Sequence, residues 1–419
     1  MTDILDELQW RGLVAQTTDE AALRSALADG PITYYVGFDP TAQSLHVGHM
    51  VQLLNMRRLQ QAGHRPLALV GGATGLIGDP RPTTERSMNS REVVAGWVER
   101  IRAQIEPFLE FEGPNAAVMV NNLDWTAPMS AIDFLRDVGK HFRMGTMLSK
   151  DIVSRRLASD EGLSFTEFSY QILQGMDFRE LFQRHGCTLQ MGGNDQWGNL
   201  LSGVELIRKT EQATVHALAT TLITKSDGSK MGKSEGGAVW LDPELTSPYA
   251  FYQFWLNTAD ADVVHYLKVF TFRTREEIEA LAVEVAERPF AREAQRALAG
   301  DLTTLIHGQA ATDAVIAASQ ALFGRGELRD LDEVTLRGAV SELPRTTAKA
   351  GDLVVDALVG AGLVASKAAA RRAIAEGGAY VNNVKVTSDE QVLEPADLLH
   401  GRYAVLRRGK RTLAVADAS

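Results

Sequence analysis

The spacing of hydrophobic and polar positions separates short apolar runs from longer stretches of helical periodicity in residues 1–225. Short apolar runs, which are typical of buried strands, occur at 32–38, 66–72 and 116–121. Helices are predicted between them, one capped by Ser44 and ending at about Ala62, and another over 91–112. Strands that alternate with helices indicate an α/β fold in which helices cover a parallel sheet.

The same pattern divides the rest of the chain. Residues 125–190 are mostly helical and interrupt the alternation as an insertion, and the strand pattern resumes near 188–192. Mostly helical spacing predicts an α-helical domain over 226–325, which begins with a basic loop. A polar, irregular stretch predicts a linker over 326–350. Short helical stretches mixed with β runs predict a small α+β domain over 351–419.

Composition changes this picture little. The chain has 419 residues, with 45 % hydrophobic and 23 % charged positions, as expected for a soluble protein of several domains. Its one cysteine, Cys187, excludes an intramolecular disulfide, and the N-terminus lacks the features of a secretory signal. We therefore expect a cytoplasmic protein without a membrane segment. The net charge of −10 argues against general coating of nucleic acid but leaves local basic patches open.

Two histidines lie three residues apart where a helix is predicted to begin. His46 and His49 would share one face of its first turn. The unpaired N–H groups and the dipole of a helix N-terminus favour an anion such as phosphate there. Two polar residues at an ordinary helix start would give the same pattern. A zinc site is a further alternative, although no third ligand lies at a nearby spacing.

A basic loop flanked by glycines follows much later in the chain. Lys230, Lys233 and Ser234 belong to it, and two ammonium groups on such a loop suit the charge on the phosphates of ATP. Only three residues separate Gly228 from Gly232, where a P-loop needs four, and no helix pattern follows. This spacing argues against a P-loop and leaves two interpretations, a mobile loop that closes on ATP or a plain surface turn.

Two further clusters predict a pocket for a small molecule. Tyr170, Gln174 and Asp177 occur at i, i+4 and i+7, so they share one helical face, and the apolar residues around them favour burial. Gly193 and Asp195 follow a strand-like run and precede a helix. A flat ligand can lie against the backbone of a glycine, and a carboxylate in this position can bind ribose hydroxyls.

Together with Tyr35 to Thr41 and Gly192 to Gln196, these motifs resemble bacterial tyrosyl-tRNA synthetases over essentially the whole chain. The histidine pair and the lysine loop match the two signatures of class I aminoacyl-tRNA synthetases, whereas the tyrosine assignment rests on Tyr35, Asp177 and their neighbours. The resemblance implies a Rossmann-like catalytic domain, a helical insertion that forms a homodimer, and a C-terminal RNA-binding domain. It also implies that ATP, with Mg²⁺, activates L-tyrosine to tyrosyl-adenylate, and that tyrosine then passes to the 3′ end of tRNA(Tyr), without a metal site on the protein.

The resemblance assigns roles to individual residues. Catalysis at the phosphates is implied for Thr41, His46, His49, Lys230, Lys233 and Ser234. Tyrosine binding is implied for Tyr35 and Asp177 at the phenol, and for Tyr170, Asp79, Gln174 and Gln196 near the α-ammonium. ATP binding is implied for Gly37, Asp39, Gly193, Asp195 and Lys233. Contacts with RNA are implied for Lys367, Arg371, Arg372, Arg407 and Arg408.

The sequence departs from the family pattern shortly after Asp79. The lysines that the family often carries there are missing, and Arg86 remains as the candidate for binding a carboxylate or phosphate. Lys150, Arg155 and Arg156 in the insertion are candidates for contacting the acceptor stem of tRNA. Two alternatives stay open: a tryptophanyl-tRNA synthetase, against which the phenol pair argues, and an RNA-binding protein without charging activity, against which the intact histidines and lysines argue.

Overall fold

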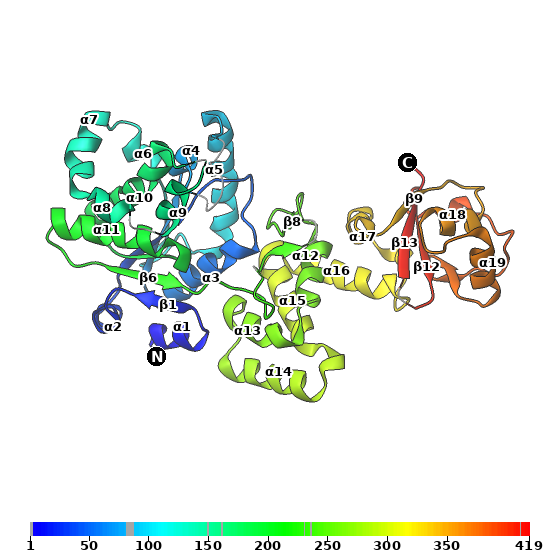
Figure 1. Ribbon diagram of the computed structural model, residues 1–419. Helices are drawn as coiled ribbons and strands as arrows, with labels where there is room; N and C mark the ends of the chain where they lie inside the picture. The colour runs from blue at the N-terminus through cyan, green and yellow to red at the C-terminus, as the bar shows by residue number, and fades with distance from the viewer. Residues whose placement is uncertain are drawn as a thin grey trace. The chain divides into compact units, whose positions relative to one another are not determined.

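The computed structural model describes residues 3–80, 88–148, 151–160, 162–229, 231–234, 237–410 and 412–419. The chain forms two compact units, which Figure 1 shows in ribbon form: Met1–Asp242 with Asp260–Ala282, and Pro243–Ala259 with Val283–Ser419. Apart from the linker over 326–350, discussed below, the domain boundaries expected from the sequence stay a prediction. Three residues named above, Arg86, Lys150 and Lys230, lie outside the described residues.

A six-stranded sheet in the order β1-β6-β5-β2-β3-β4 forms the centre of the first unit. Its strands are β1 Val14–Thr17, β2 Thr33–Phe38, β3 Arg65–Val70, β4 Val118–Asn121, β5 Cys187–Gly193 and β6 His216–Thr220. The edge strand β1 is antiparallel to β6, and every other pair is parallel. The predicted α/β fold with a parallel sheet is therefore confirmed. The carboxyl ends of the parallel strands lie at one edge of the sheet, which is where ligands bind in such folds.

Helices accompany this sheet along the first unit. They are α1 Ile4–Trp10, α2 Glu20–Ala28, α3 Val47–Gln61, α4 Thr74–Ile77, α5 Arg91–Ile105, α6 Leu123–Thr126, α7 Ala131–Asp133, α8 Met144–Leu148, α9 Asp151–Leu157, α10 Phe165–His185, α11 Trp197–Thr210 and α13 Asp260–Phe270. The predicted helix over 91–112 is too long, because Pro107 has no N–H to continue it and a 3₁₀ turn, Glu106–Phe108, follows α5. Within the described residues, no helix combines the length and apolar character needed to cross a membrane.

The second unit contains helices and a five-stranded sheet in the order β11-β10-β12-β13-β9. Its helices are α12 Pro248–Leu256, α15 Glu293–His307, α16 Gln309–Leu322, α17 Glu333–Val340, α18 Val354–Gly360 and α19 Lys367–Ala375, and α14 Arg275–Glu287 joins the two units along the chain. The strands are β9 Arg345–Thr347, β10 Ala379–Val381, β11 Val384–Lys385, β12 Tyr403–Arg408 and β13 Thr412–Asp417. This arrangement of short helices and a small sheet confirms the predicted C-terminal α+β fold.

The stretch 326–350 is not the irregular linker that its polar composition predicts. It contains α17 and the strand β9, which pairs with β13. Leu336 and Val340 lie on one face of α17 and are buried in a cluster that includes Tyr403. The burial of this apolar face stabilises the helix, and local polarity does not reveal it. Residues 326–350 therefore belong to the core of the second unit.

Candidate active site

A cavity of about 520 Å³ lies at the carboxyl ends of β2 and β5, and the start of α3 and one face of α10 also line it. Its lining includes most of the residues to which the sequence assigns a role: Tyr35, Gly37, Asp39, Thr41, His46, His49, Asp79, Tyr170, Gln174, Asp177, Gly193, Asp195 and Gln196. Segments that are far apart in the sequence thus meet at one site. Lys233 and Ser234 form the short strand β7, but the orientation of their side chains is not described.

The two histidines build the start of α3. His46 is the N-cap residue, and its Nδ1 accepts a hydrogen bond from the backbone N–H of Gly48 at 3.0 Å. The Nδ1 of His49 accepts one from the backbone N–H of His46 at 3.1 Å. The rings stack with their centroids 4.0 Å apart. The predicted cap at Ser44 is wrong, because the hydroxyl of this buried residue donates to the carbonyl of Leu45 instead.

This capping determines which backbone N–H groups at the start of α3 are available to an anion. The N–H groups at the start of the helix are occupied, because Val47 donates to the carbonyl of Val239 at 3.0 Å and His49 donates to the carbonyl of His46 at 2.8 Å. The prediction of unpaired N–H groups at this helix end is therefore wrong for these residues. Both imidazoles belong to the lining of the cavity.

Burial and a hydrogen bond together determine the protonation state and the tautomer of His49. Burial lowers the pKa of His49 to about 3, and the neighbouring His46 ring adds to this effect. His49 is therefore neutral near pH 7. Because its Nδ1 accepts a backbone N–H, the proton of the neutral ring is on Nε2. This Nε2–H group is a neutral donor, from which an oxygen of a phosphate or a ribose can accept a hydrogen bond.

The basic loop and the helix start contact each other. Met231, which lies between the predicted lysines, is buried and lines the cavity. The carbonyl of Gly232 accepts from the N–H of Val239, and the carbonyl of Val239 accepts from the N–H of Val47. A side chain at position 232 would meet Val47 at 2.9 Å, and Gly232 has a φ of +91°. This close approach requires glycine and fixes the described part of the loop beside α3.

Tyr35 and Asp177 form a buried polar pair in the lining of the cavity. Asp177 accepts hydrogen bonds from the Nδ2 of Asn122 at 3.0 Å and from the indole N–H of Trp125 at 2.8 Å. Burial raises the pKa of the Asp177 carboxyl to about 7, although these two donors oppose the rise. Among the described residues, the buried hydroxyl of Tyr35 has no hydrogen-bond partner, and burial followed by the charge of Asp177 raises its pKa. A ligand that brings both a donor and an acceptor would satisfy the two groups.

Replacing Tyr35 with phenylalanine should therefore affect the bound state and not the fold. The substitution removes one buried oxygen that has no partner among the described residues, so thermal unfolding should shift little or upward. Tyrosine binding should weaken by roughly tenfold, and phenylalanine binding should not. Calorimetric titration with both amino acids measures these effects. Equal weakening of both would assign the hydroxyl no part in recognising a phenol.

A second polar network in the cavity lining is centred on Asp39. The hydroxyl of Tyr170 donates to Oδ2 of Asp39 at 2.7 Å, and the hydroxyl of Thr74 donates to Oδ1 at 2.6 Å. A Cβ at Gly71 would lie 2.1 Å from Oδ1 of Asp39, so glycine is needed there for the network to form. Because the proton of Tyr170 is directed to Asp39, its oxygen can accept a hydrogen bond from an ammonium group.

Asp79 is held by two amides. It accepts from Nε2 of Gln196 at 3.0 Å and from Nδ2 of Asn199 at 3.3 Å. Asn199 also donates to Oε1 of Gln196 at 2.9 Å. These bonds orient the carboxylate of Asp79 and the amide of Gln196 together. The structure thus places both beside Tyr170 in the cavity lining, where the sequence predicts the α-ammonium site.

The sequence analysis missed several residues of the site. Gln190 is buried in the lining, and its Oε1 has no partner among the described residues. Gln52 donates to the hydroxyl of Thr220 at 2.6 Å, and this hydroxyl donates to the carbonyl of Gly192 at 3.2 Å. The position of Gln52 one turn after His49, on the same helical face, is a signal that could have identified it.

The predicted RNA-binding residues of α19 are exposed but have acidic neighbours. Lys367 pairs with Asp356 at 2.7 Å, and Arg371 pairs with Asp389 at 3.1 Å. Exposed ion pairs of this kind contribute little to stability, so the cations can exchange their partners for phosphates. Arg372 is exposed on the same helix.

The predicted residues of β12 have a different environment. The guanidinium of Arg407 lies 3.9 Å from the ring centroid of Tyr380 on the neighbouring strand. Arg408 is exposed and donates to the carbonyl of Leu363 at 3.1 Å. This cation–π contact packs the guanidinium against the neighbouring strand β10.

The insertion does not offer all of its predicted basic residues to RNA. Arg156 is fully buried and pairs with the buried Glu167 at 2.8 Å, and it also donates to the carbonyl of Gly162. Its proposed contact with the acceptor stem is therefore wrong. Arg155 is exposed. In the described part of the chain, no group of three or more His, Cys, Asp or Glu side chains has the geometry to hold a metal ion.

Comparison with known proteins places this site in a family. The sequence matches the family model for class I tRNA synthetases (W and Y) over residues 27–324, and the tyrosine–tRNA ligase SYY-like C-terminal domain over 335–416. A tyrosine–tRNA ligase from Streptomyces coelicolor is 66 % identical over 418 residues, which cover 100 % of this chain and 99 % of the relative. One from Acidothermus cellulolyticus is 60 % identical, with 99 % of each chain covered. The chain belongs to the tyrosine–tRNA ligase family.

Solved structures agree with this assignment. A C-terminally truncated mitochondrial tyrosyl-tRNA synthetase from Aspergillus nidulans matches with a TM-score of 0.70 and 30 % identity, covering 77 % of this chain and 95 % of that structure. A tryptophanyl-tRNA synthetase from Encephalitozoon cuniculi, at 15 % identity and a TM-score of 0.56 over 74 % of this chain and 87 % of that one, shows the shared fold alone. The resemblance found in the sequence is thus confirmed.

Proposed function

We propose that the protein activates L-tyrosine with ATP and transfers the tyrosyl group to tRNA(Tyr). One observation carries the proposal: the histidine pair, the described end of the basic loop and the Tyr35–Asp177 pair line a single cavity. The first two suit a nucleotide triphosphate, and the third suits a phenol. Full-length relatives named tyrosine–tRNA ligase support the same function.

In the first step, a carboxylate oxygen of tyrosine attacks the α-phosphorus of ATP, which enters as its Mg²⁺ complex. The bond from this phosphorus to the bridging oxygen breaks, and pyrophosphate leaves with the bonding electrons. No covalent bond to the protein is needed, so the side chains act by positioning the reactants and stabilising charge. In the second step, a ribose hydroxyl at the 3′ end of tRNA attacks the tyrosyl carbonyl, and AMP leaves.

The histidines act as neutral donors in the first step. The Nε2–H of His49 can donate to an oxygen on which negative charge grows during the attack, and stacking against His46 holds the ring in place. We assign Lys230, Lys233 and Ser234 to the leaving pyrophosphate, with Thr41 beside them, and Gly37, Asp39, Gly193 and Asp195 to the nucleoside. Arg86 remains our candidate for a carboxylate or phosphate contact.

The buried pair selects the amino acid. The phenol of tyrosine can donate to the carboxylate of Asp177 and accept from the hydroxyl of Tyr35. We assign its α-ammonium to Tyr170, Gln174 and Asp79, with the network of Asp39 holding Tyr170 in place. Phenylalanine would leave the buried carboxylate without its third donor, and this loss disfavours the wrong substrate.

Tyrosine affinity should decrease as the pH is lowered through about 7. In the free protein the pKa of Asp177 is raised to about 7, whereas a bound phenol that donates to the carboxylate stabilises its ionised form. Below this pH, tyrosine must bind with release of a proton, so its affinity should fall by up to about tenfold per pH unit. Calorimetry in buffers of different ionisation enthalpy measures the affinity and the proton release. Asp177→Asn should bind with a weaker pH dependence; an affinity that rises toward low pH would contradict the assignment.

We infer a homodimer formed by the insertion, in agreement with the sequence-based prediction. Ile132, Leu135, Met144 and Phe165 are exposed there, at 69 %, 55 %, 56 % and 70 %. Exposed apolar side chains of this size, all within the insertion, suit a protein interface. Sedimentation at micromolar concentration tests this inference.

We also infer that the protein acts in the cytoplasm, because its proposed substrate is tRNA and its one cysteine is buried and free.

Charge reversal on α19 should weaken tRNA binding and leave tyrosine activation unchanged. Changing Lys367, Arg371 and Arg372 to glutamate removes cations that can bind phosphates, so the affinity for tRNA should fall at least about tenfold and its salt dependence should become weaker. Filter binding at several salt concentrations measures both effects. Arg371→Lys with Arg372→Lys keeps the charge and should retain the affinity. Unchanged binding by the reversed variant would exclude α19 from the RNA surface.

A charging assay tests the proposed function as a whole. The purified protein should attach radiolabelled tyrosine to tRNA(Tyr) in the presence of ATP and Mg²⁺. Tryptophan should not be attached to tRNA(Trp) under the same conditions. A protein that binds tRNA but charges it with neither amino acid would support the alternative of an RNA-binding protein without synthetase activity.

A further inference from the structure

Helix α13 contacts the chain just before the basic loop. Oδ1 of Asp262, near the start of the helix, accepts a hydrogen bond from the backbone N–H of Ser226 at 2.8 Å. One turn later, the hydroxyl of Tyr266 donates to the carbonyl of Thr224 at 3.4 Å. Asp262 and Tyr266 are both buried. Two side chains of α13 thus hold the same short segment.

The segment that they hold is a turn leading into the loop. The N–H of Lys225 donates to the carbonyl of Ser229, and the N–H of Gly228 donates to the carbonyl of Lys225, both at 2.9 Å. The N–H of Met231 donates to the carbonyl of Ile223 at 3.4 Å, and Met231 lines the cavity. Hydrogen bonds therefore connect Asp262, through this turn, with the segment that carries Met231 in the cavity lining.

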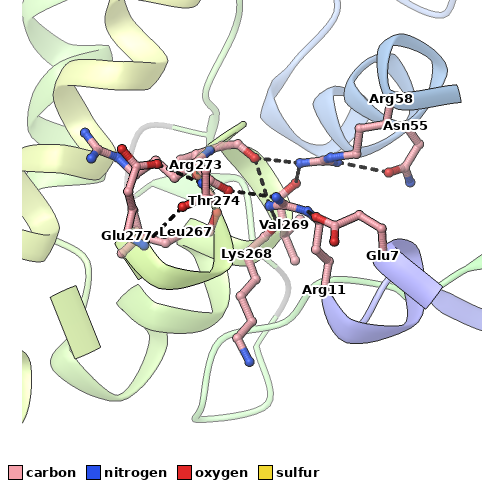
Figure 2. Close-up of polar contacts among 11 residues, drawn as sticks. Glu7, Arg11, Asn55, Arg58, Leu267, Lys268, Val269, Arg273, Thr274 and Glu277 are labelled. Carbon is pink, nitrogen blue, oxygen red and sulfur yellow. Dashed lines mark hydrogen bonds and ion pairs between the residues drawn. The ribbon is translucent and has the colours of Figure 1, made fainter. Parts of the chain in front are cut away.

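The other end of α13 is tied to the histidine helix. Arg58, in the last turn of α3, donates from Nη2 to the carbonyls of Val269 and Thr271, each at 2.8 Å. Arg11, at the end of α1, donates to the carbonyls of Lys268, Thr271 and Arg273 at 2.7, 3.0 and 2.8 Å. Figure 2 shows both guanidinium groups directed at this end of α13.

These arginines make a rigid connection. Arg58 is 5 % exposed and Arg11 is 4 % exposed, and both donate to the same carbonyl, that of Thr271. The carbonyl groups at a helix C-terminus carry a partial negative charge, which stabilises nearby cations. Arg58 also donates to Oδ1 of Asn55 on its own helix at 3.0 Å. Breaking the contacts of a buried charge is costly, so these hydrogen bonds favour one position for the end of α13.

We propose that Asp262 is a positioning residue for tyrosine activation, which holds the turn before the basic loop at a fixed place relative to the histidine helix. Its bond to Ser226 joins the turn to α13, and Arg58 joins α13 to α3. Met231, in the basic loop, lines the cavity together with His46 and His49, so a fixed turn favours a fixed position for this part of the loop. The inference rests on the proposed function, because it assigns a part in that same reaction.

The two steps of the reaction separate this role from a purely structural one. The basic loop is assigned to pyrophosphate, which leaves in the first step. In the second step no pyrophosphate is present, so the position of the turn should matter little. A residue that only stabilised the fold would affect both steps, or neither.

Rapid-quench measurements on the full-length protein test the proposal. Asp262→Ala should lower the rate of tyrosyl-adenylate formation by roughly tenfold, because the N–H of Ser226 loses its charged acceptor. The binding of tyrosine should be unchanged, as should the transfer rate from preformed tyrosyl-adenylate to tRNA. Asp262→Asn keeps an acceptor oxygen at this position and should restore most of the rate.

A matched control lies on the same helix. His265 packs beside Gly12 of the N-terminal segment, and no hydrogen bond joins its side chain to residues 223–229 in the described structure. His265→Ala should destabilise α13 without slowing activation selectively. The proposal would be overturned if Asp262→Ala left activation unchanged, or slowed both steps equally, as a destabilised fold would. Failure of the proposed function itself would appear differently, as an unmodified protein that forms no tyrosyl-adenylate.

Discussion

Replacing His49 with alanine should lower the rate of tyrosyl-adenylate formation by about 100-fold. The neutral ring has its proton on Nε2, as its low pKa and its bond to the N–H of His46 require. Its loss removes one fixed donor from the charge that develops on the phosphate, and such donors each contribute roughly 100- to 1000-fold to a rate. Stopped-flow measurement of adenylate formation at saturating tyrosine and ATP gives this effect directly.

The control for this substitution is a histidine outside the cavity. His185, in the last turn of α10, is half-buried and does not line the site. His185→Ala should activate tyrosine at the rate of the unmodified protein. If His49→Ala lowered the rate less than about threefold, the histidine pair would be a helix cap without a part in catalysis.

Replacing Asp177 with alanine should abolish most of the preference for tyrosine over phenylalanine. In the binding mode that we propose, the carboxylate accepts a hydrogen bond from the phenol. Hydrogen bonds to charged groups contribute about 1.5–3 kcal/mol, which corresponds to roughly 10- to 100-fold in the ratio of kcat/KM values. ATP affinity should not change, because Asp177 is held by Asn122 and Trp125 and is not among the residues that we assign to the nucleotide. Steady-state pyrophosphate exchange with each amino acid measures the ratio.

The effect of Asp177→Ala on the stability of the fold should be measured separately, by thermal unfolding. Alanine at position 177 leaves the amide of Asn122 and the indole of Trp125 without their acceptor, so the variant should unfold at a lower temperature. Comparison with Trp125→Phe, which removes one of those donors and leaves the carboxylate, separates stability from selectivity. An unchanged ratio of tyrosine to phenylalanine in Asp177→Ala would show that the phenol binds elsewhere.

Much of the fold follows from local sequence, because the buried strands are short apolar runs and the helices between them have clear periodicity. The segment 326–350 could not be predicted in this way, since α17 is stabilised by contacts with β12 and β13, which lie much later in the chain. The start of α3 was misplaced for a related reason. Ser44 has the chemistry of a cap, but its hydroxyl is directed to Leu45, and the imidazole of His46 takes its place.

The residues of the site also fall into those that the sequence could identify and those that it could not. His46, His49 and Tyr170 could be identified because each lies in a short motif with its own spacing. Trp125 could not, because it reaches Asp177 only through the fold, from the short helix α6. Sequence also does not reveal charge pairing, and it therefore presented Arg156 as a contact for RNA although it is buried against Glu167.

Point substitutions test the RNA contacts of the second unit better than a truncation does. Tyr403 and Val405 of β12 and Val415 of β13 are buried in one cluster with Leu322 of α16 and Leu336 of α17. Removal of residues 351–419 would expose this cluster, so loss of charging in a truncated protein would combine lost RNA contacts with a damaged core. Charge changes on the exposed face of α19 avoid this problem.

Pyrophosphate exchange into ATP with single amino acids tests the central claim most directly, namely that one cavity combines a nucleotide site with a slot for a phenol. We predict rapid exchange with tyrosine, exchange with phenylalanine that is slower by orders of magnitude, and none with tryptophan. Exchange with tryptophan alone, or equal exchange with tyrosine and phenylalanine, would contradict the account.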